Sequence, residues 1–232
     1  VPTKIENNFK LTVKDLSGKI TDKTKLLILP FPNNPTGAIM TRKDLEPIAE
    51  LLKDTNILIL SDEIYSELTY GRKHCSIIEL DGMKERTILV NGFSKAFAMT
   101  GWRLGYVTAP SPIIDQIIKI HQYAIMCSPT VSQYAAIEAL SSCEAEVQKM
   151  VDEYNIRRRF LVSELNRIGL ECFKPEGAFY VFPSIKSTGL SSEEFCERLL
   201  FEENVAVVPG DAFGESGEGY IRISYAYSLK HL

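Results

Sequence analysis

The amino-acid sequence predicts an α/β fold followed by a smaller α+β unit. In the first half of the chain, short apolar runs alternate with amphipathic helical patterns, which is typical of α/β proteins. A long polar-faced helix near 144–168 then stops at Gly169, and the segment after it has only short strands and one helix. We therefore expect one domain over residues 1–145 and a second over residues 146–232, bridged by this helix.

Four strands are expected in the first half, near 26–29, 57–60, 87–90 and 103–108. Three helices complete this half. Thr41 is a candidate cap for a helix near 42–54, in which apolar residues recur on one face. The other two helices are expected to begin at Ser111–Pro112 and at Ser128–Pro129, because proline is favoured in the first turn of a helix.

The second half is expected to contain short strands near 178–182 and 219–225, on either side of a helix over about 193–203. Ser191 and Glu194 form a capping-box pattern at the start of that helix, in which each side chain satisfies a free backbone N–H. Internal repeats and low-complexity segments are absent. This unit is therefore predicted to mix helix and sheet.

The most informative stretch is NGFSKAFAMTGWRLGYV, residues 91–107, which places Lys95 just after an apolar run and Arg103 eight positions later. A site that desolvates a lysine amine lowers its pKa and frees it to attack carbonyls. An arginine held nearby acts in the same direction, and its guanidinium suits a phosphate. Together with small residues such as Ser94, the pattern favours a Schiff base to a phosphorylated aldehyde. Taken alone, Lys95 would be interpreted as a solvent-exposed lysine.

Further polar residues follow other predicted strands. Asp62 and Tyr65 come directly after the strand near 57–60, and Asn34 lies in the turn PFPNNPTG after the strand near 26–29. Ligands of open α/β sheets bind beyond the carboxyl ends of the strands, so these side chains lie where a site is expected. A turn rich in proline and glycine is a plain connector in most proteins, but here it places Asn34 at the same sheet edge.

Four motifs resemble those of the fold-type I pyridoxal-phosphate (PLP) aminotransferases of the aspartate and aromatic class, namely NNPTG, SDEIY, FSK with an arginine eight residues on, and YIRISYA. Each motif is weak alone, whereas four in this order at strand ends are specific, and the resemblance runs over essentially the whole chain. It implies part of the PLP-binding large domain, with a mostly parallel sheet and helices on both faces, plus a smaller α+β C-terminal domain. It also implies that the four early strands are neighbours, the fourth antiparallel, and that the Asn34–Pro35 bond is cis.

The resemblance implies roles at the cofactor for four matching residues. Lys95 would form the Schiff base with PLP and then move the substrate proton as general acid and base. Asp62 would pair with the pyridine nitrogen, which must stay protonated for the cofactor to act as an electron sink. Tyr65 and Asn34 would donate hydrogen bonds to the 3′ oxygen of the cofactor.

Two arginines would bind the anionic groups. Arg103 resembles the ligand of the cofactor phosphate, and Arg222, in YIRIS, resembles the arginine that clamps the substrate α-carboxylate through a bidentate contact. Many members of this family carry a serine three residues before the lysine, where its hydroxyl reaches the phosphate. Here that position is Gly92, so Ser94 or backbone N–H groups would take over this contact.

The implied activity transfers the amino group of an L-amino acid, of the aspartate or aromatic type, to a 2-oxo acid such as 2-oxoglutarate. The intact enzyme would be a homodimer. The resemblance begins midway through the family pattern, so we expect this chain to lack the upstream phosphate-binding loop and the aromatic residue that stacks on the cofactor. The isolated chain is therefore expected to be weakly active or inactive, because catalysis depends on a held geometry. Its two uncovered sheet edges would also favour self-association.

Composition narrows the class of protein. With 45% hydrophobic and 24% charged residues, the 232-residue chain can bury a sizeable core. A net charge of −4 gives no basic surface for nucleic acid, and no apolar run approaches the length of a membrane span. The five scattered cysteines indicate reduced thiols and a cytoplasmic protein, and the three histidines show no metal-binding spacing.

Three alternatives stay open at this point. PLP-dependent lyases that act on C–S bonds share the same scaffold. Aminotransferase-like domains also serve as effector-binding modules of bacterial regulators, which would need an upstream DNA-binding helix-turn-helix. A Schiff-base enzyme without PLP is the third alternative, and it would leave Asp62 and Arg103 without a role.

Overall fold

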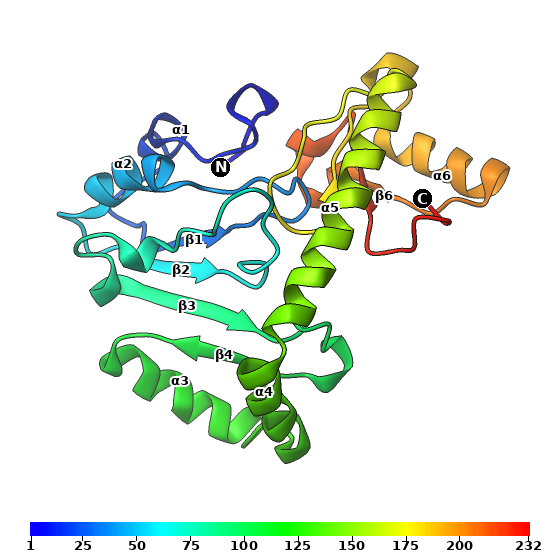
Figure 1. Cartoon of the computed structure of the whole chain (residues 1–232). Coiled ribbons are helices and arrows are strands. Elements are labelled where there is room, and N and C mark those ends of the chain that lie inside the picture. Colours follow the sequence, from blue (N-terminus) through cyan, green and yellow to red (C-terminus); the bar gives the residue numbers. More distant parts are fainter.

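The structure, a computed structural model, describes all 232 residues and contains two sheets joined by a long helix (Figure 1). The first sheet has the strand order β1-β2-β3-β4. Its strands are β1 (Leu26–Pro30), β2 (Leu58–Asp62), β3 (Thr87–Gly92) and β4 (Gly105–Thr108). The first three run parallel and β4 pairs antiparallel with β3, so the expected arrangement of the four strands is confirmed.

The carboxyl edge of this sheet differs in detail from the prediction. β2 and β3 each run two residues further than expected. The parallel ladder extends β2 by pairing Asp62 with Pro30 and Val90, and the antiparallel ladder with β4 extends β3 by pairing Asn91 with Tyr106 and Gly92 with Gly105. β4 starts at Gly105 rather than near residue 103. Arg103 has a φ of 51°, in the left-handed region, and follows the short 3-10 turn η4 (Thr100–Trp102), so a strand cannot begin there.

Helices of the first half cover the strands. They comprise the short η1 (Ile5–Asn7) and α1 (Val13–Ser17), then α2 (Arg42–Leu52), α3 (Ser111–Ala124) and α4 (Thr130–Ser142). α2 begins at the predicted cap, where the Asp44 carboxylate accepts hydrogen bonds from the Thr41 N–H at 2.8 Å and the Thr41 hydroxyl at 2.6 Å. Its apolar face packs into the largest core cluster together with residues of β1 and β2.

A second core lies along α5 (Glu144–Arg167), which runs from α4 towards the second sheet (Figure 1). Val151, Leu161 and Leu165 of this helix share one buried cluster with Tyr65 from the first half and Tyr180 from the second sheet. The predicted bridging helix is therefore present and packs against both parts. The boundary between residues 145 and 146 stays a prediction. No helix in the chain has both the length and the apolar character needed to cross a membrane.

The second sheet has the order β5-β7-β6, with β5 (Tyr180–Val181), β6 (Val208–Pro209) and β7 (Ile221–Ser224). β6 has only two residues and leaves no pattern in the sequence. The intervening helix, α6 (Ser192–Glu203), has half of the expected capping box. The Ser191 hydroxyl accepts from the Glu194 N–H at 3.2 Å, while the Ser192 N–H donates to the Glu218 carboxylate at 2.9 Å.

The loop after β1 is joined to the segment that leads into β5. The carbonyl of Gly37 accepts hydrogen bonds from the N–H groups of Glu176 and Gly177, at 3.0 and 2.9 Å. Gly37 has a φ of +69°, and a Cβ atom there would lie 2.3 Å from the Cβ of Pro175, so only glycine fits this contact. The Asn34–Pro35 bond in this loop is cis, as expected.

Candidate active site

Lys95 lies in the turn directly after β3, at the carboxyl edge of the first sheet. Its side chain is half-buried between two aromatic rings. The Nζ atom is 6.0 Å from the ring centre of Tyr65 and 5.9 Å from the ring centre of Phe179. The amine is therefore placed beside a residue of the first sheet edge and a residue that precedes β5.

Asp62 and Tyr65 lie at the end of the neighbouring strand. Asp62 is the last residue of β2, and its carboxylate accepts a hydrogen bond from the Ile64 N–H at 3.2 Å. The Tyr65 hydroxyl is buried and lies 3.0 Å from the hydroxyl of Tyr180. Burial and this hydrogen bond raise the pKa of Tyr65; the charge of Asp62 adds to the rise and that of Arg222 opposes it. Both charged groups are thus within electrostatic reach of Tyr65.

Arg222 comes from β7 and reaches the first sheet. Its Nη1 donates a 3.0 Å hydrogen bond to Oδ1 of Asn34. The guanidinium carbon lies 4.7 Å from the ring centre of Tyr180 and 5.1 Å from that of Phe213. The Nε atom is buried and has no hydrogen-bond partner. This cation is therefore held by an amide and two rings and keeps an unsatisfied donor.

The two residues predicted to bind phosphate are less closely tied to the others. Arg103 is exposed at the same edge, and its Nη1 donates to the Thr100 carbonyl at 2.9 Å. Ser94 is half-buried in the turn beside Lys95. No hydrogen bond or ion pair joins either residue to Lys95, Asp62 or Tyr65, so their contact with a phosphate stays a prediction.

The absence of a serine at position 92 has a structural reason. Gly92 pairs directly with Gly105 across β3 and β4. A Cβ atom on Gly92 would lie 3.0 Å from the Gly105 Cα and 3.1 Å from the Leu104 carbonyl oxygen. A side chain at this position would be tight and would require the neighbouring backbone to move by a few tenths of an ångström. With glycine here, any hydroxyl for the phosphate comes from another residue.

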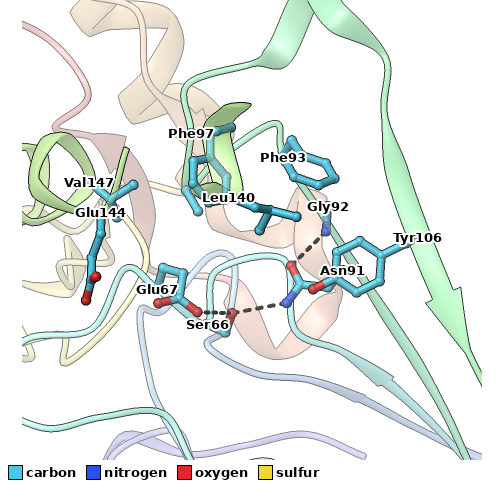
Figure 2. Close-up of a pocket in the computed structure, with 12 residues that line it drawn as sticks. Ser66, Glu67, Asn91, Gly92, Phe93, Phe97, Tyr106, Leu140, Glu144 and Val147 are labelled. Carbon is cyan, nitrogen blue, oxygen red and sulfur yellow. Dashed lines mark hydrogen bonds between the residues drawn. The ribbon is translucent and has the colours of Figure 1, made fainter. Parts of the chain in front are cut away.

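A hollow of about 290 Å³ opens beside this edge but contains none of the predicted site residues (Figure 2). Apolar side chains such as Phe93, Phe97 and Leu140 line it together with the carboxylates of Glu67 and Glu144. Two carboxylates would repel a phosphate. The side chains around Lys95 therefore remain the better candidate for binding an anionic cofactor.

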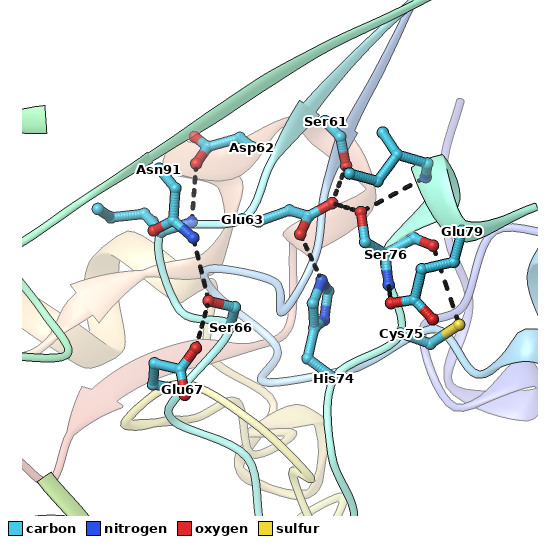
Figure 3. Close-up of polar contacts among 12 residues, drawn as sticks. Ser61, Asp62, Glu63, Ser66, Glu67, His74, Cys75, Ser76, Glu79 and Asn91 are labelled. Carbon is cyan, nitrogen blue, oxygen red and sulfur yellow. Dashed lines mark hydrogen bonds and ion pairs between the residues drawn. The ribbon is translucent and has the colours of Figure 1, made fainter. Parts of the chain in front are cut away.

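A buried polar network lies behind Asp62 (Figure 3). Glu63 is 4% exposed, and its carboxylate accepts hydrogen bonds from Ser61 and Ser76 at 2.8 and 2.6 Å and pairs with His74 Nε2 at 2.8 Å. Burial acts to raise the pKa of Glu63, but the hydrogen bonds from its three partners outweigh it and hold the pKa below its usual value. The network ties the chain after β2 to the segment around residue 75, and no pattern in the sequence indicates it.

Three aromatic residues at the site were also missed, namely Phe179, Tyr180 and Phe213. The signal for the first two is the run GAFY, in which two rings directly follow a glycine and a small residue at the start of a predicted strand. The glycine, Gly177, is needed because a Cβ atom there would lie 2.7 Å from Pro32. No comparable signal marks Phe213, which is brought in by the fold of the second sheet.

The donor set suits PLP. The cofactor carries an aldehyde, a pyridine nitrogen, a hydroxyl and a phosphate. The aldehyde is complemented by the amine of Lys95 and the pyridine nitrogen by the carboxylate of Asp62. The hydroxyl is complemented by the phenol of Tyr65 and the phosphate by the guanidinium of Arg103. The unsatisfied Nε of Arg222 is a donor that a carboxylate could fill. The residues present therefore fit this cofactor and a ligand that carries a carboxylate.

The protein-family model described as aminotransferase class I and II matches residues 1–231. The chain belongs to this family. Class I and II aminotransferases depend on PLP, and their fold is the α/β architecture found here. The expectations of an aminotransferase family, of this fold and of this cofactor are thereby confirmed.

Alignments with individual relatives extend over the whole chain or nearly all of it. It is 52% identical to the aspartate aminotransferase of Pyrococcus abyssi and 51% identical to aromatic-amino-acid aminotransferase 2 of Thermococcus litoralis, in each case over 100% of this chain and 60% of the relative. The crystal structure of an aromatic aminotransferase from Pyrococcus horikoshii superposes with a TM-score of 0.97 at 51% identity, over 99% of this chain and 62% of that one. The chain thus spans about 60% of the length of the curated relatives it matches.

Proposed function

We propose that this chain carries the reactive lysine and the substrate-binding arginine of a PLP-dependent aminotransferase. The enzyme would move the amino group of an L-amino acid to a 2-oxo acid such as 2-oxoglutarate. The observation that carries this proposal is the meeting of two parts of the chain at one sheet edge. Lys95 lies beside Tyr65 and Phe179, and Arg222 reaches across from β7 to Asn34.

PLP, when bound, supplies an electron sink for negative charge at the substrate Cα. The amine of Lys95 would first act as the nucleophile and later move a proton at that carbon, since it is the amine held between the two rings. Asp62 would hold a proton on a ring nitrogen through its negative charge. The hydroxyl of Tyr65 and the amide of Asn34 would donate hydrogen bonds to an oxygen on the same ring.

Arg222 would orient the substrate. A guanidinium offers five donors in a fixed plane, and Arg222 uses one of them on Asn34 and leaves Nε unsatisfied. The remaining donors suit the two oxygens of an α-carboxylate, which all amino-acid and 2-oxo-acid substrates share. Relatives named as aspartate and as aromatic aminotransferases support an amino donor of the aspartate or aromatic type.

Borohydride reduction in the presence of PLP, followed by peptide mapping, tests the role of Lys95. We expect the label on Lys95 and its loss in Lys95→Ala, while a Lys119→Ala control keeps it. A label on Lys43, Lys73 or Lys119 in the wild-type chain would contradict the proposal. Transfer from L-aspartate or L-phenylalanine to 2-oxoglutarate then tests the reaction class, and release of pyruvate and ammonia from a cysteine conjugate would indicate a lyase instead.

A further inference from the structure

One side chain contacts both ends of the proposed site. Tyr180, in β5, is 7% exposed. Its hydroxyl lies 3.0 Å from the hydroxyl of Tyr65, and its ring centre lies 4.7 Å from the guanidinium carbon of Arg222. The rings of Tyr65 and Tyr180 also meet edge to face, with their centres 6.0 Å apart. Tyr180 therefore contacts both Tyr65 and Arg222.

The hydrogen bond between the two hydroxyls can run in only one direction if Tyr65 is to donate its proton to another acceptor. A phenol has a single proton and can also accept. If Tyr65 donated to Tyr180, it would have no proton left for another acceptor. If Tyr180 donates to Tyr65, the Tyr65 proton stays free, and a hydroxyl that accepts one hydrogen bond becomes a stronger donor of the next. The direction from Tyr180 to Tyr65 is therefore the productive one.

The ring of Tyr180 constrains Arg222 in a different way. A guanidinium is attracted to an aromatic ring, and this contact leaves its N–H groups available for hydrogen bonds. Phe213 adds a second ring at 5.1 Å, and Asn34 accepts from Nη1. The buried Nε then remains as a donor whose direction is set before any ligand arrives. A pre-set donor binds a carboxylate with less loss of side-chain freedom.

We propose that Tyr180 is a positioning residue that orients the Tyr65 hydroxyl through its own hydroxyl and holds the Arg222 guanidinium through its ring. The inference rests on the proposed function, because Tyr65 and Arg222 take their roles from it. The two contacts use different parts of one side chain, so they can be removed separately. Tyr180→Phe removes the hydroxyl and keeps the ring, whereas Tyr180→Leu removes both.

The first measurement is a pH titration of the absorbance of bound PLP. A hydrogen bond from Tyr65 stabilises a negatively charged cofactor oxygen, so weakening it favours the protonated form. We expect Tyr180→Phe to raise the titration midpoint, by less than Tyr65→Phe does. An unchanged midpoint in Tyr180→Phe would overturn the role of the hydroxyl.

The second measurement is the dissociation constant of 2-oxoglutarate, obtained by calorimetry. We expect Tyr180→Phe to stay within about twofold of wild type and Tyr180→Leu to bind about fivefold more weakly or worse, since a ring over a guanidinium contributes on this scale. Equal binding by wild type and Tyr180→Leu would overturn the role of the ring. Circular dichroism of each variant checks that the fold is kept.

A third measurement separates this inference from the proposed function. If the wild-type chain takes up no PLP, the proposed function fails for this chain. The contact between the two hydroxyls can then still be tested on the cofactor-free protein. A double-mutant cycle of Tyr65→Phe and Tyr180→Phe on the free energy of unfolding isolates the coupling of the two hydroxyls. A measurable coupling supports the contact, and additive losses overturn it.

Discussion

Arg222 and Asn34 lie 188 positions apart in the sequence and are joined by a 3.0 Å hydrogen bond from Nη1 to Oδ1. Asn34 belongs to the loop after β1, and Arg222 belongs to the central strand of the second sheet. The bond therefore links the two sheets at the place where the substrate is proposed to bind. Together with the rings of Tyr180 and Phe213, this bond holds the arginine before a carboxylate arrives.

Removing the acceptor should weaken substrate binding. We expect Asn34→Ala to raise the dissociation constant of 2-oxoglutarate about tenfold, which corresponds to about 1.4 kcal/mol, because a hydrogen bond to a charged group contributes on this scale. Calorimetry measures the effect. Asn56→Ala, an exposed asparagine outside the site, is the matched control and should bind like wild type. Equal affinities in the two variants would show that Asn34 does not hold Arg222.

Gly37 should tolerate no side chain. We expect Gly37→Ala to lower the free energy of unfolding by roughly 2–4 kcal/mol, because its φ of +69° is unfavourable for alanine and its Cβ would collide with Pro175. Gly71→Ala is the control, since Gly71 has a similar φ of +81° but open space around a Cβ. It should lose only about 1–2 kcal/mol. Urea denaturation measures both, and equal losses would mean that the contact with Pro175 is relaxed in solution.

Glu63 should make the free energy of unfolding depend on pH in the acidic range. A carboxylate whose pKa is lower in the folded state than in the unfolded state stabilises the fold at neutral pH, and this contribution is lost as the pH falls through the lowered pKa. We expect the free energy of unfolding to fall below about pH 5 in wild type and to fall less in Glu63→Gln. At pH 7 the variant should be less stable by about 1–3 kcal/mol, because buried partners lose a charged acceptor.

Denaturant titrations at several pH values test this dependence. Glu203→Gln changes an exposed glutamate and serves as the control, with an expected profile like that of wild type. Asp44 also has a lowered pKa, because its hydrogen bonds from Lys10 and Thr41 outweigh the opposing effect of burial, and it contributes equally in all three proteins. Parallel profiles for wild type and Glu63→Gln would contradict the prediction.

The pair α3 and α4 should drive self-association. Several large apolar side chains on these helices and on the segment between them are exposed, with Ile120 at 71%, Tyr123 at 95%, Met126 at 75% and Tyr134 at 71%. Exposed apolar side chains in this number favour association in water. We expect light scattering to show association that rises with concentration and that weakens in Tyr134→Lys. Tyr227→Lys, at an exposed tyrosine near the C-terminus, should leave association unchanged. A monodisperse monomer at high concentration would refute the expectation.

Much of the fold could be predicted because local patterns agree with it. Apolar runs indicate β1 to β3, and the cap at Thr41 marks the start of α2. α2 ends at Leu52, two residues before the expected end near 54, although Lys53 keeps helical backbone angles. The start of β4 differs from the prediction, since it depends on a backbone conformation that residue type does not fix. Arg103 in the left-handed region is the clearest case, because no pattern distinguishes it from a strand residue.

At the site, the sequence indicates which residues carry reactive groups but not what holds them. Lys95 and Asp62 are recognisable from motifs at strand ends, and Arg222 from the motif YIRIS, which lies within β7. The contacts of Tyr180 and Phe213 with Arg222 join residues from different strands and loops, so they arise only when the second sheet folds. The Glu63 network was missed for the same reason, because its partner His74 lies 11 positions away along an irregular segment.

The 24-residue helix α5 connects the two sheets. At 1.5 Å per residue it is about 36 Å long, so a tilt of about 5° at one end displaces the other by about 3 Å. That displacement equals the length of the hydrogen bond between Arg222 and Asn34. Part-way along the helix, Arg158 donates a hydrogen bond to the Pro175 carbonyl in the second half of the chain. Its guanidinium carbon lies 4.5 Å from the ring centre of Tyr70 in the first half. Because α5 packs in one buried cluster with Tyr65 and Tyr180, a substitution that tilts this helix is expected to disturb the contact between Arg222 and Asn34.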